Sequence, residues 1–114
     1  MRVKRGLVSH RKHKKLLEFN KGYRMTKRRL VKVAKEAYLH AGEYAFAGRK
    51  QKKRDIRKLW TVHINGGLQG LGITYSRFIN ALKKAKIELD RKILSEMILE
   101  DFETFKKVVE KAKG

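Results

Sequence analysis

The feature that most constrains this chain is a proline-free stretch of 35 residues from Leu30 to Ile64. Small and apolar residues recur along it at helical spacing, which predicts a single long helix. At about 1.5 Å per residue, such a helix reaches roughly 50 Å, which exceeds the width of a small domain. The rest of the chain is too short to cover it, so we expect much of the helix to pack on another molecule. The stripe consists of Leu30, Ala34, Ala37, Ala41, Ala45, Gly48, Ile56, Leu59, Trp60 and Ile64.

Positive charge is concentrated in the first half of the 114 residues. Lys and Arg number 31 against 11 Asp and Glu, a formal net charge of +20. Residues 1–59 hold 21 basic and 4 acidic residues, net +17, whereas residues 60–114 hold 10 and 7, net +3. Self-repulsion opposes collapse of the first part, which has few bulky apolar residues to bury. We therefore expect a basic RNA-binding arm and long helix over 1–59, which need a polyanion, and a small α-helical domain over 60–114.

The expected fold is all-α, with a basic N-terminal extension, one long helix and a small helical C-terminal domain. Residues 1–22 are interpreted as an arm that is disordered in the free protein, with room for about two helical turns over 13–19. Thr26 is the expected N-cap of the long helix, whose first turn then holds Lys27, Arg28 and Arg29. The glycines at 66, 67, 70 and 72 are expected to end it.

Three short amphipathic helices are expected in the C-terminal part, over about 76–85, from Asp90 onward and over about 102–113. Asp90 has the features of an N-cap, because Leu89 and Leu94 flank it at the spacing of a hydrophobic staple. The residues expected to face inward, including a fourth wall from the long helix, are Leu59, Trp60, Ile64, Phe78, Ile79, Leu82, Ile93, Leu94, Met97, Ile98, Phe105, Val108, Val109 and Ala112.

Enzymatic, metal-binding and membrane functions find little support. The chain has no cysteine, which excludes disulfides, thiolate zinc sites and a catalytic thiol. His10 and His13 are three apart, but no third ligand follows at a useful spacing, so we expect no metal and no cofactor. The run GGLQGLG at 66–72 follows a helix rather than a strand and is interpreted as a turn. No apolar run has the length of a transmembrane helix or the character of a signal peptide.

The charge favours a nucleic-acid partner, because Lys and Arg neutralise phosphates and release their counterions. Aromatic residues interleave with the cations, as in proteins that stack on unpaired bases. We expect Tyr23 to contact RNA, and Tyr44 and Trp60, which belong to the helix stripe, to pack.

DNA is the competing ligand, as in a general nucleoid or DNA-packaging protein. The only candidate for a groove-reading helix begins at Arg91, yet it carries Glu96 and Glu100, which oppose insertion beside phosphates. A bare basic helix with a basic arm is better suited to threading between packed RNA helices.

Several sequence motifs, spread over essentially the full length of the chain, resemble those of a known family. The chain resembles the family of the bacterial large-subunit (50S) ribosomal protein numbered twenty. The motifs are RVKRG at 2–6, HKK at 13–15, KGY at 21–23, AGEYAFAGRKQKKRDIRKLW at 41–60, INGGLQGLGITYSRFINALKKA at 64–85 and ELDRKIL at 88–94.

The resemblance implies a structural constituent of the large subunit that binds its (23S) ribosomal RNA directly and is needed for early assembly. It implies no role in peptidyl transfer. Neighbouring large-subunit proteins are implied partners, and so, in some members, is the protein's own messenger RNA. We expect a cytoplasmic, ribosome-bound chain that is neither a membrane protein nor a homo-oligomer.

Three positions depart from the family's pattern: His63 replaces an arginine, Arg24 a tyrosine, and Gly66-Gly67 the common alanines. The residues expected to bind ribosomal RNA are Arg2, Lys4, Arg5, His10, Arg11, Lys12, His13, Lys14, Lys15, Lys21, Tyr23, Arg24, Lys27, Arg28, Arg29, Lys32, Arg49, Lys50, Lys52, Lys53, Arg54, Arg57, Lys58, His63, Tyr75, Ser76 and Arg77.

Folding of the first half should therefore depend on RNA. Circular dichroism of the free protein at physiological salt should show less helix than the sequence pattern allows, and the signal should rise when RNA is added, because phosphates remove the repulsion between cations. Full helicity without RNA would contradict this expectation.

Overall fold

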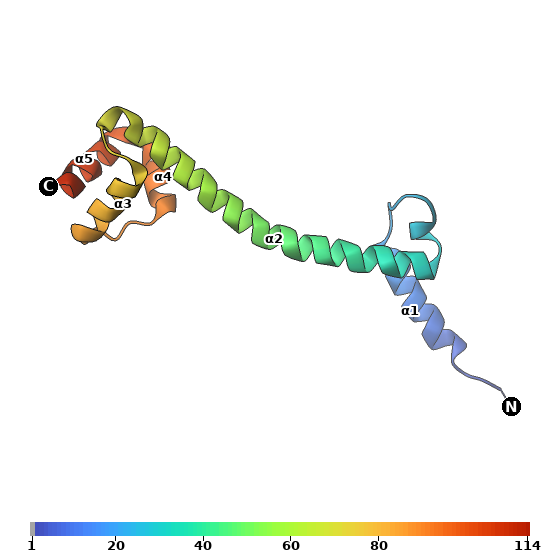
Figure 1. Cartoon of the computed structure of the whole chain (residues 1–114). Coiled ribbons are helices and arrows are strands. Elements are labelled where there is room, and N and C mark those ends of the chain that lie inside the picture. The colour runs from blue at the N-terminus through green and yellow to red at the C-terminus, as the bar shows by residue number, and fades with distance from the viewer. Residues whose placement is uncertain (1) are drawn as a thin grey trace. The chain divides into compact units, whose positions relative to one another are not determined.

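The computed structural model describes residues 2–114, which form helices joined by short loops (Figure 1). No strand occurs in this range, which confirms the all-α prediction. Contacts within the chain divide it into two compact units, residues 1–50 and 51–114. The helices are α1 (Gly6–Phe19), the 3-10 helix η1 (Met25–Arg28), α2 (Val31–Leu68), the 3-10 helix η2 (Gln69–Leu71), α3 (Tyr75–Lys84), α4 (Arg91–Glu100) and α5 (Phe102–Lys113).

Helix α2 has 38 residues and confirms the prediction of one long helix. Its start differs from the expectation, because Thr26 lies in η1 and does not cap α2. The 3-10 helix η1 ends at Arg28, and Arg29 follows it with φ of −119° and ψ of −50°, so the backbone leaves regular helical geometry before α2 begins at Val31. The carbonyl of Thr26 then closes a turn by accepting from the N–H groups of Arg29 and Leu30. The cations Lys27 to Arg29 consequently precede α2 rather than fill its first turn.

The first unit has very little buried surface. Helix α1 is longer than the two turns expected and meets the beginning of α2 (Figure 1). Asn20, directly after α1, is fully buried, and its amide nitrogen donates to the carbonyl oxygens of Lys27 at 3.1 Å and Ala34 at 2.8 Å. The rings of Phe19 and Tyr38 lie 5.3 Å apart. Asn20 and Ala34 are the two buried residues among 2–50. The hydrogen bonds of Asn20, rather than a hydrophobic core, therefore hold the segment around η1 against α2.

The second unit has a conventional core. The end of α2, α3, α4 and α5 each contribute to it, and Phe78 and Phe105 meet edge to face with ring centroids 5.8 Å apart. The buried members are Ile64, Leu68, Phe78, Leu82, Leu94, Phe105, Val109 and Ala112. The core explains why this less charged part of the chain folds by burial of apolar surface.

Two of the expected core residues are exposed. Leu59 is 51% exposed, because a five-residue separation rotates it by about 140° from the buried Ile64. Ile93 is 39% exposed, since α4 buries the next two positions, Leu94 and Ser95, instead. Trp60 is half-buried, and the buried wall from α2 is formed by Ile64 and Leu68.

Helix ends in the second unit follow the sequence closely. The carboxylate of Asp90 accepts from the N–H of Ile93 at 2.8 Å, which confirms the predicted N-cap of α4. Asp101 caps α5 in the same way, and hydrogen bonds from the hydroxyl and then the N–H of Thr104 lower the pKa of its carboxyl below the ordinary 3.8. Gly72, with φ of 68°, adopts the left-handed conformation that terminates η2.

The first two glycines of the expected helix terminator lie inside α2 instead. A Cβ on Gly66 would meet no atom within 4 Å, whereas a Cβ on Gly67 would lie 2.9 Å from Cδ1 of Ile98 and 3.3 Å from Cε1 of Phe105. Gly67 therefore permits close packing of α2 on α4 and α5, and Gly66 has no such role.

This pair of glycines gives a matched test. Gly66→Ala should raise the free energy of unfolding of the second unit by roughly 0.5–1 kcal/mol, because alanine loses less backbone entropy in a helix. Gly67→Ala should give a smaller gain or a loss, since its methyl group must displace Ile98. Chemical denaturation of both variants measures the difference. Equal stabilisation by the two substitutions would contradict the close packing at Gly67.

Candidate nucleic-acid interface

The side chains predicted to bind RNA lie at the surface. All are exposed except Tyr23, His63 and Tyr75, which are half-buried. Within residues 2–114, no Lys or Arg of this set has a carboxylate within 4 Å; ion-pair geometry is found for His40 with Glu36 and Glu43 and for Lys106 with Glu103. The positive charge of the predicted interface is therefore not neutralised by the chain itself.

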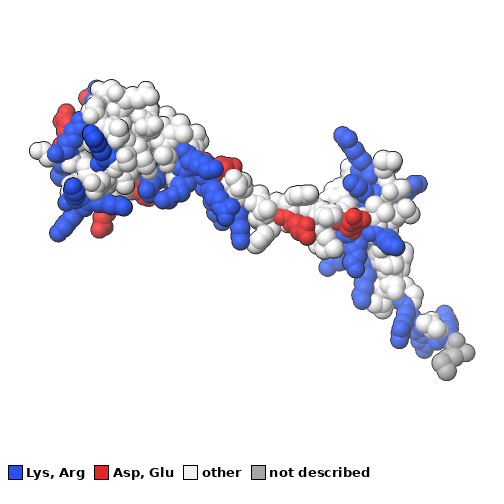
Figure 2. Space-filling model, viewed as in Figure 1, with Lys and Arg blue, Asp and Glu red and all other residues white. Residues whose placement is uncertain are grey.

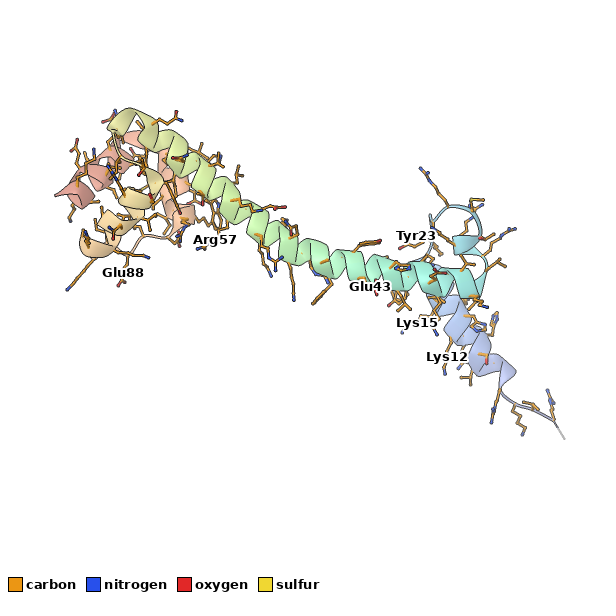
Figure 3. The ribbon with its side chains drawn as sticks, in the orientation of Figure 1. Lys12, Lys15, Tyr23, Glu43, Arg57 and Glu88 are labelled. Atoms are coloured by element: carbon orange, nitrogen blue, oxygen red, sulfur yellow. The ribbon has the colours of Figure 1, made fainter. Side chains whose placement is uncertain are left out.

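In the first unit, the cations line α1 and the loop before α2. Lys12 and Lys15 project from α1 (Figure 3), and basic side chains cover much of the visible surface of this helix (Figure 2). The segment between α1 and α2, which contains η1, adds a second group of exposed cations. This group comprises Lys21, Arg24, Lys27, Arg28 and Arg29.

In the second unit, the first turns belong to α2 and are densely basic. Lys52, Lys53, Arg54, Arg57 and Lys58 are all exposed. The single acid among them is Asp55, whose carboxylate accepts from Nε2 of Gln51 at 2.8 Å. No Lys or Arg side chain among residues 2–114 lies within 4 Å of this carboxylate, so the neighbouring cations are not paired with it.

Two predicted contact residues make bonds inside the second unit. Nδ1 of His63 lies 2.8 Å from Oγ of Ser95, which is 3% exposed, and this bond joins α2 to α4. Nε of Arg91 donates to the hydroxyl of Tyr75 at 2.7 Å and joins α4 to α3. The sequence contained no signal for either pair, because the partners are 32 and 16 residues apart.

The fold also assembles a basic hollow that the sequence indicated only in part. It has a volume of about 550 Å³ and lies between α3 and the end of α5. Arg77 was predicted, but the other polar members were missed. Asn80 and Lys84 follow Arg77 on α3, whereas Lys111 and Lys113 come from the distant end of α5. The ammonium group of Lys113 also donates to the carbonyl of Leu71, which ties the end of α5 to η2.

The structure contradicts the prediction made for one aromatic residue, Tyr44. Tyr44 is 75% exposed, so the prediction that it packs against the rest of the chain is wrong. It lies on α2 beside residues of small volume, where the first unit has no core to receive it. Tyr23 is half-buried in the loop between α1 and α2.

We also searched the described residues for a metal site and for a membrane-spanning helix. Residues 2–114 contain no cluster of three His, Asp or Glu side chains suited to a metal ion. No helix in the same range combines the length and hydropathy needed to cross a membrane.

The comparison with known families decides the assignment. Residues 2–108 match the family described as ribosomal protein L20. The chain belongs to the ribosomal protein L20 family. Members are structural proteins of the large ribosomal subunit rather than enzymes, and this places the chain in the ribosome, with ribosomal RNA and ribosomal proteins as partners. The resemblance found in the sequence motifs is confirmed.

The bond between His63 and Ser95 leads to a prediction for the role of His63. His63→Ala should destabilise the second unit by about 1–2 kcal/mol, since it leaves the buried Ser95 hydroxyl without a partner. The affinity of this variant for ribosomal RNA should change by less than about twofold, because the imidazole of His63 already forms a hydrogen bond within the second unit. Thermal unfolding and filter binding measure the two effects.

Ser95→Ala serves as the control, because it removes both the hydroxyl and the need for a partner. It should cost less than His63→Ala. Loss of RNA affinity in His63→Ala at unchanged stability would instead identify His63 as an RNA contact.

Proposed function

We propose that this chain binds large-subunit ribosomal RNA directly and acts early in assembly of the subunit by neutralising charge where RNA segments meet. The observation that carries the proposal is the exposed set of Lys and Arg side chains without acidic partners. Phosphates brought together by folding RNA repel one another, and a cation between them lowers this cost. The role is structural, with no part in peptidyl transfer.

Arginine and lysine contribute differently to such bridging. The planar guanidinium group can hold two phosphate oxygens at once, whereas an ammonium group acts as a compact point charge. We assign the bridging role to the cations around the beginning of α2 and at the start of the second unit: Arg28, Arg29, Lys32, Lys53, Arg54, Arg57 and Lys58. Their side chains leave a helix or a tight turn, so the backbone presents them at defined positions.

The two parts of the chain divide the work in this proposal. Residues 1–59 supply most of the charge and order on RNA, and residues 60–114 form a stable domain that docks through Ser76, Arg77 and the basic hollow between α3 and α5. The opposite character of Glu96, Glu100, Asp101 and Glu103, all exposed, favours solvent or protein at that face. The ribosome containing the chain would be cytoplasmic, and binding to its own messenger remains a prediction from the resemblance.

The dependence of RNA affinity on salt tests the proposal. Replacing Arg54 and Arg57 by Gln should weaken binding to large-subunit RNA and reduce the magnitude of the slope of log K against log salt by roughly 1.4–1.8, since each phosphate contact contributes about 0.7–0.9. Filter binding across a salt series measures both quantities.

The matched control is the double replacement of Lys106 and Lys107 by Gln on α5, which removes equal charge outside the predicted interface and should leave the slope nearly unchanged. A second arm addresses the alternative, a DNA-packaging protein. If duplex DNA displaces the protein from structured ribosomal RNA at equal concentration, the proposed function fails.

A further inference from the structure

One segment of α2 departs sharply from the charge of its surroundings. Residues 36–48 contain two glutamates and neither Lys nor Arg, although Lys and Arg make up 31 of the 114 residues. The side chains of Glu36 and Glu43 are 73% and 74% exposed. His40 lies between them, with ring nitrogens 3.8 and 3.5 Å from the two carboxylates. A surface of this sign repels phosphate groups, so RNA is a poor match for it.

Exposed aromatic and aliphatic side chains accompany these carboxylates. Tyr38, Leu39 and Phe46 are 41%, 55% and 57% exposed, values that are high for large apolar residues beside a helix–helix contact. They line a hollow of about 600 Å³ whose wall contains one carboxylate and no Lys or Arg. Tyr23 and Glu43 lie in the same part of the first unit (Figure 3). The residues that define this acidic aromatic face are Phe19, Tyr23, Tyr38, Leu39, Glu43 and Phe46.

A surface that combines aromatic rings with a carboxylate is suited to binding cationic side chains. The face of a ring attracts ammonium and guanidinium groups, and a nearby carboxylate adds a charge-assisted hydrogen bond. The face already shows this behaviour, since Nζ of Lys50 lies 4.4 Å from the centroid of the Phe46 ring. The rings of Phe19 and Tyr38, tilted by 41°, present a second apolar surface without such a cation.

An unpaired RNA base is the competing occupant, because bases also stack on aromatic rings. A base, however, carries its phosphates with it, and here they would approach Glu43 and Glu36. A basic peptide meets the same surface with opposite charge. White and red atoms rather than blue ones cover this part of α2 in Figure 2, so the charge distribution favours the peptide.

We propose that the acidic aromatic face is a docking surface for a neighbouring protein, which contributes a basic and partly apolar segment. Lys or Arg side chains of that segment lie over the aromatic rings and pair with Glu43, and apolar side chains cover Leu39 and Phe46. The Lys and Arg residues to which we assign RNA bridging lie outside residues 36–48. Tyr23 and Lys50, both predicted to contact RNA, belong to this face or touch it, so the proposal reassigns these two residues to the protein partner. The bridging role of the other cations and the docking surface can each fail without the other.

Photocrosslinking in assembled large subunits tests the proposal. A photoreactive phenylalanine analogue replaces Leu39, which lines the face, and in a parallel sample it replaces Gln51, which lies beside the cations of the second unit. Position 39 should yield adducts mainly with another protein, joined to a peptide that contains Lys or Arg. Position 51 should yield adducts mainly with RNA. RNA adducts at position 39, or the absence of adducts there while position 51 reacts, would overturn the proposal.

Charge variants examine the complementarity directly. Glu43→Lys should reduce the protein adduct at position 39 by at least about threefold, because it places like charges in contact. Glu43→Gln should give an intermediate yield, and Glu88→Lys, at an exposed glutamate of the second unit, should change nothing. Affinity for protein-free ribosomal RNA should be equal or higher in Glu43→Lys. An unchanged adduct yield in this variant would contradict a basic partner.

Discussion

The first unit is governed by repulsion between cations that no acidic side chain offsets. Two unit charges 4 Å apart in water cost about 1 kcal/mol, and salt at physiological strength screens only beyond about 8 Å. This repulsion opposes compaction of a unit in which only Asn20 and Ala34 are buried among residues 2–50. The counter-charge that relieves it must come from outside the chain.

The second unit follows the opposite logic. Its net charge is +7, from 15 basic and 8 acidic residues, against +13 for the first unit, and its helices bury apolar side chains against one another in the usual way. Polar bonds then fix how the helices meet: His63 with Ser95 and Arg91 with Tyr75 each join two helices. His63 and Tyr75, which were predicted to contact RNA, thereby hold the helices of this unit together.

The features that depend on local signals could be predicted from the sequence. The cap at Asp90, the extent of α5 and the existence of the long helix all follow from residue types at fixed spacing. The predicted start of α2 was wrong because nothing in the sequence marks the irregular backbone of Arg29, which separates η1 from α2. Leu59 was misplaced because a stripe drawn over many turns tolerates a phase error that a packed core does not. The exposed cations were predictable from charge, whereas the hollow between α3 and α5 required the tertiary fold, and nothing marked Asn20 among the polar residues of the arm.

Asn20 has a consequence for the loop that precedes α2. Both of its bonds come from one amide nitrogen, so the carbonyls of Lys27 and Ala34 are held close to a common point. The amide is neutral, and salt does not screen its bonds as it screens interactions between charges. Salt therefore weakens the repulsion between the cations of this loop but leaves the bonds that close it in place.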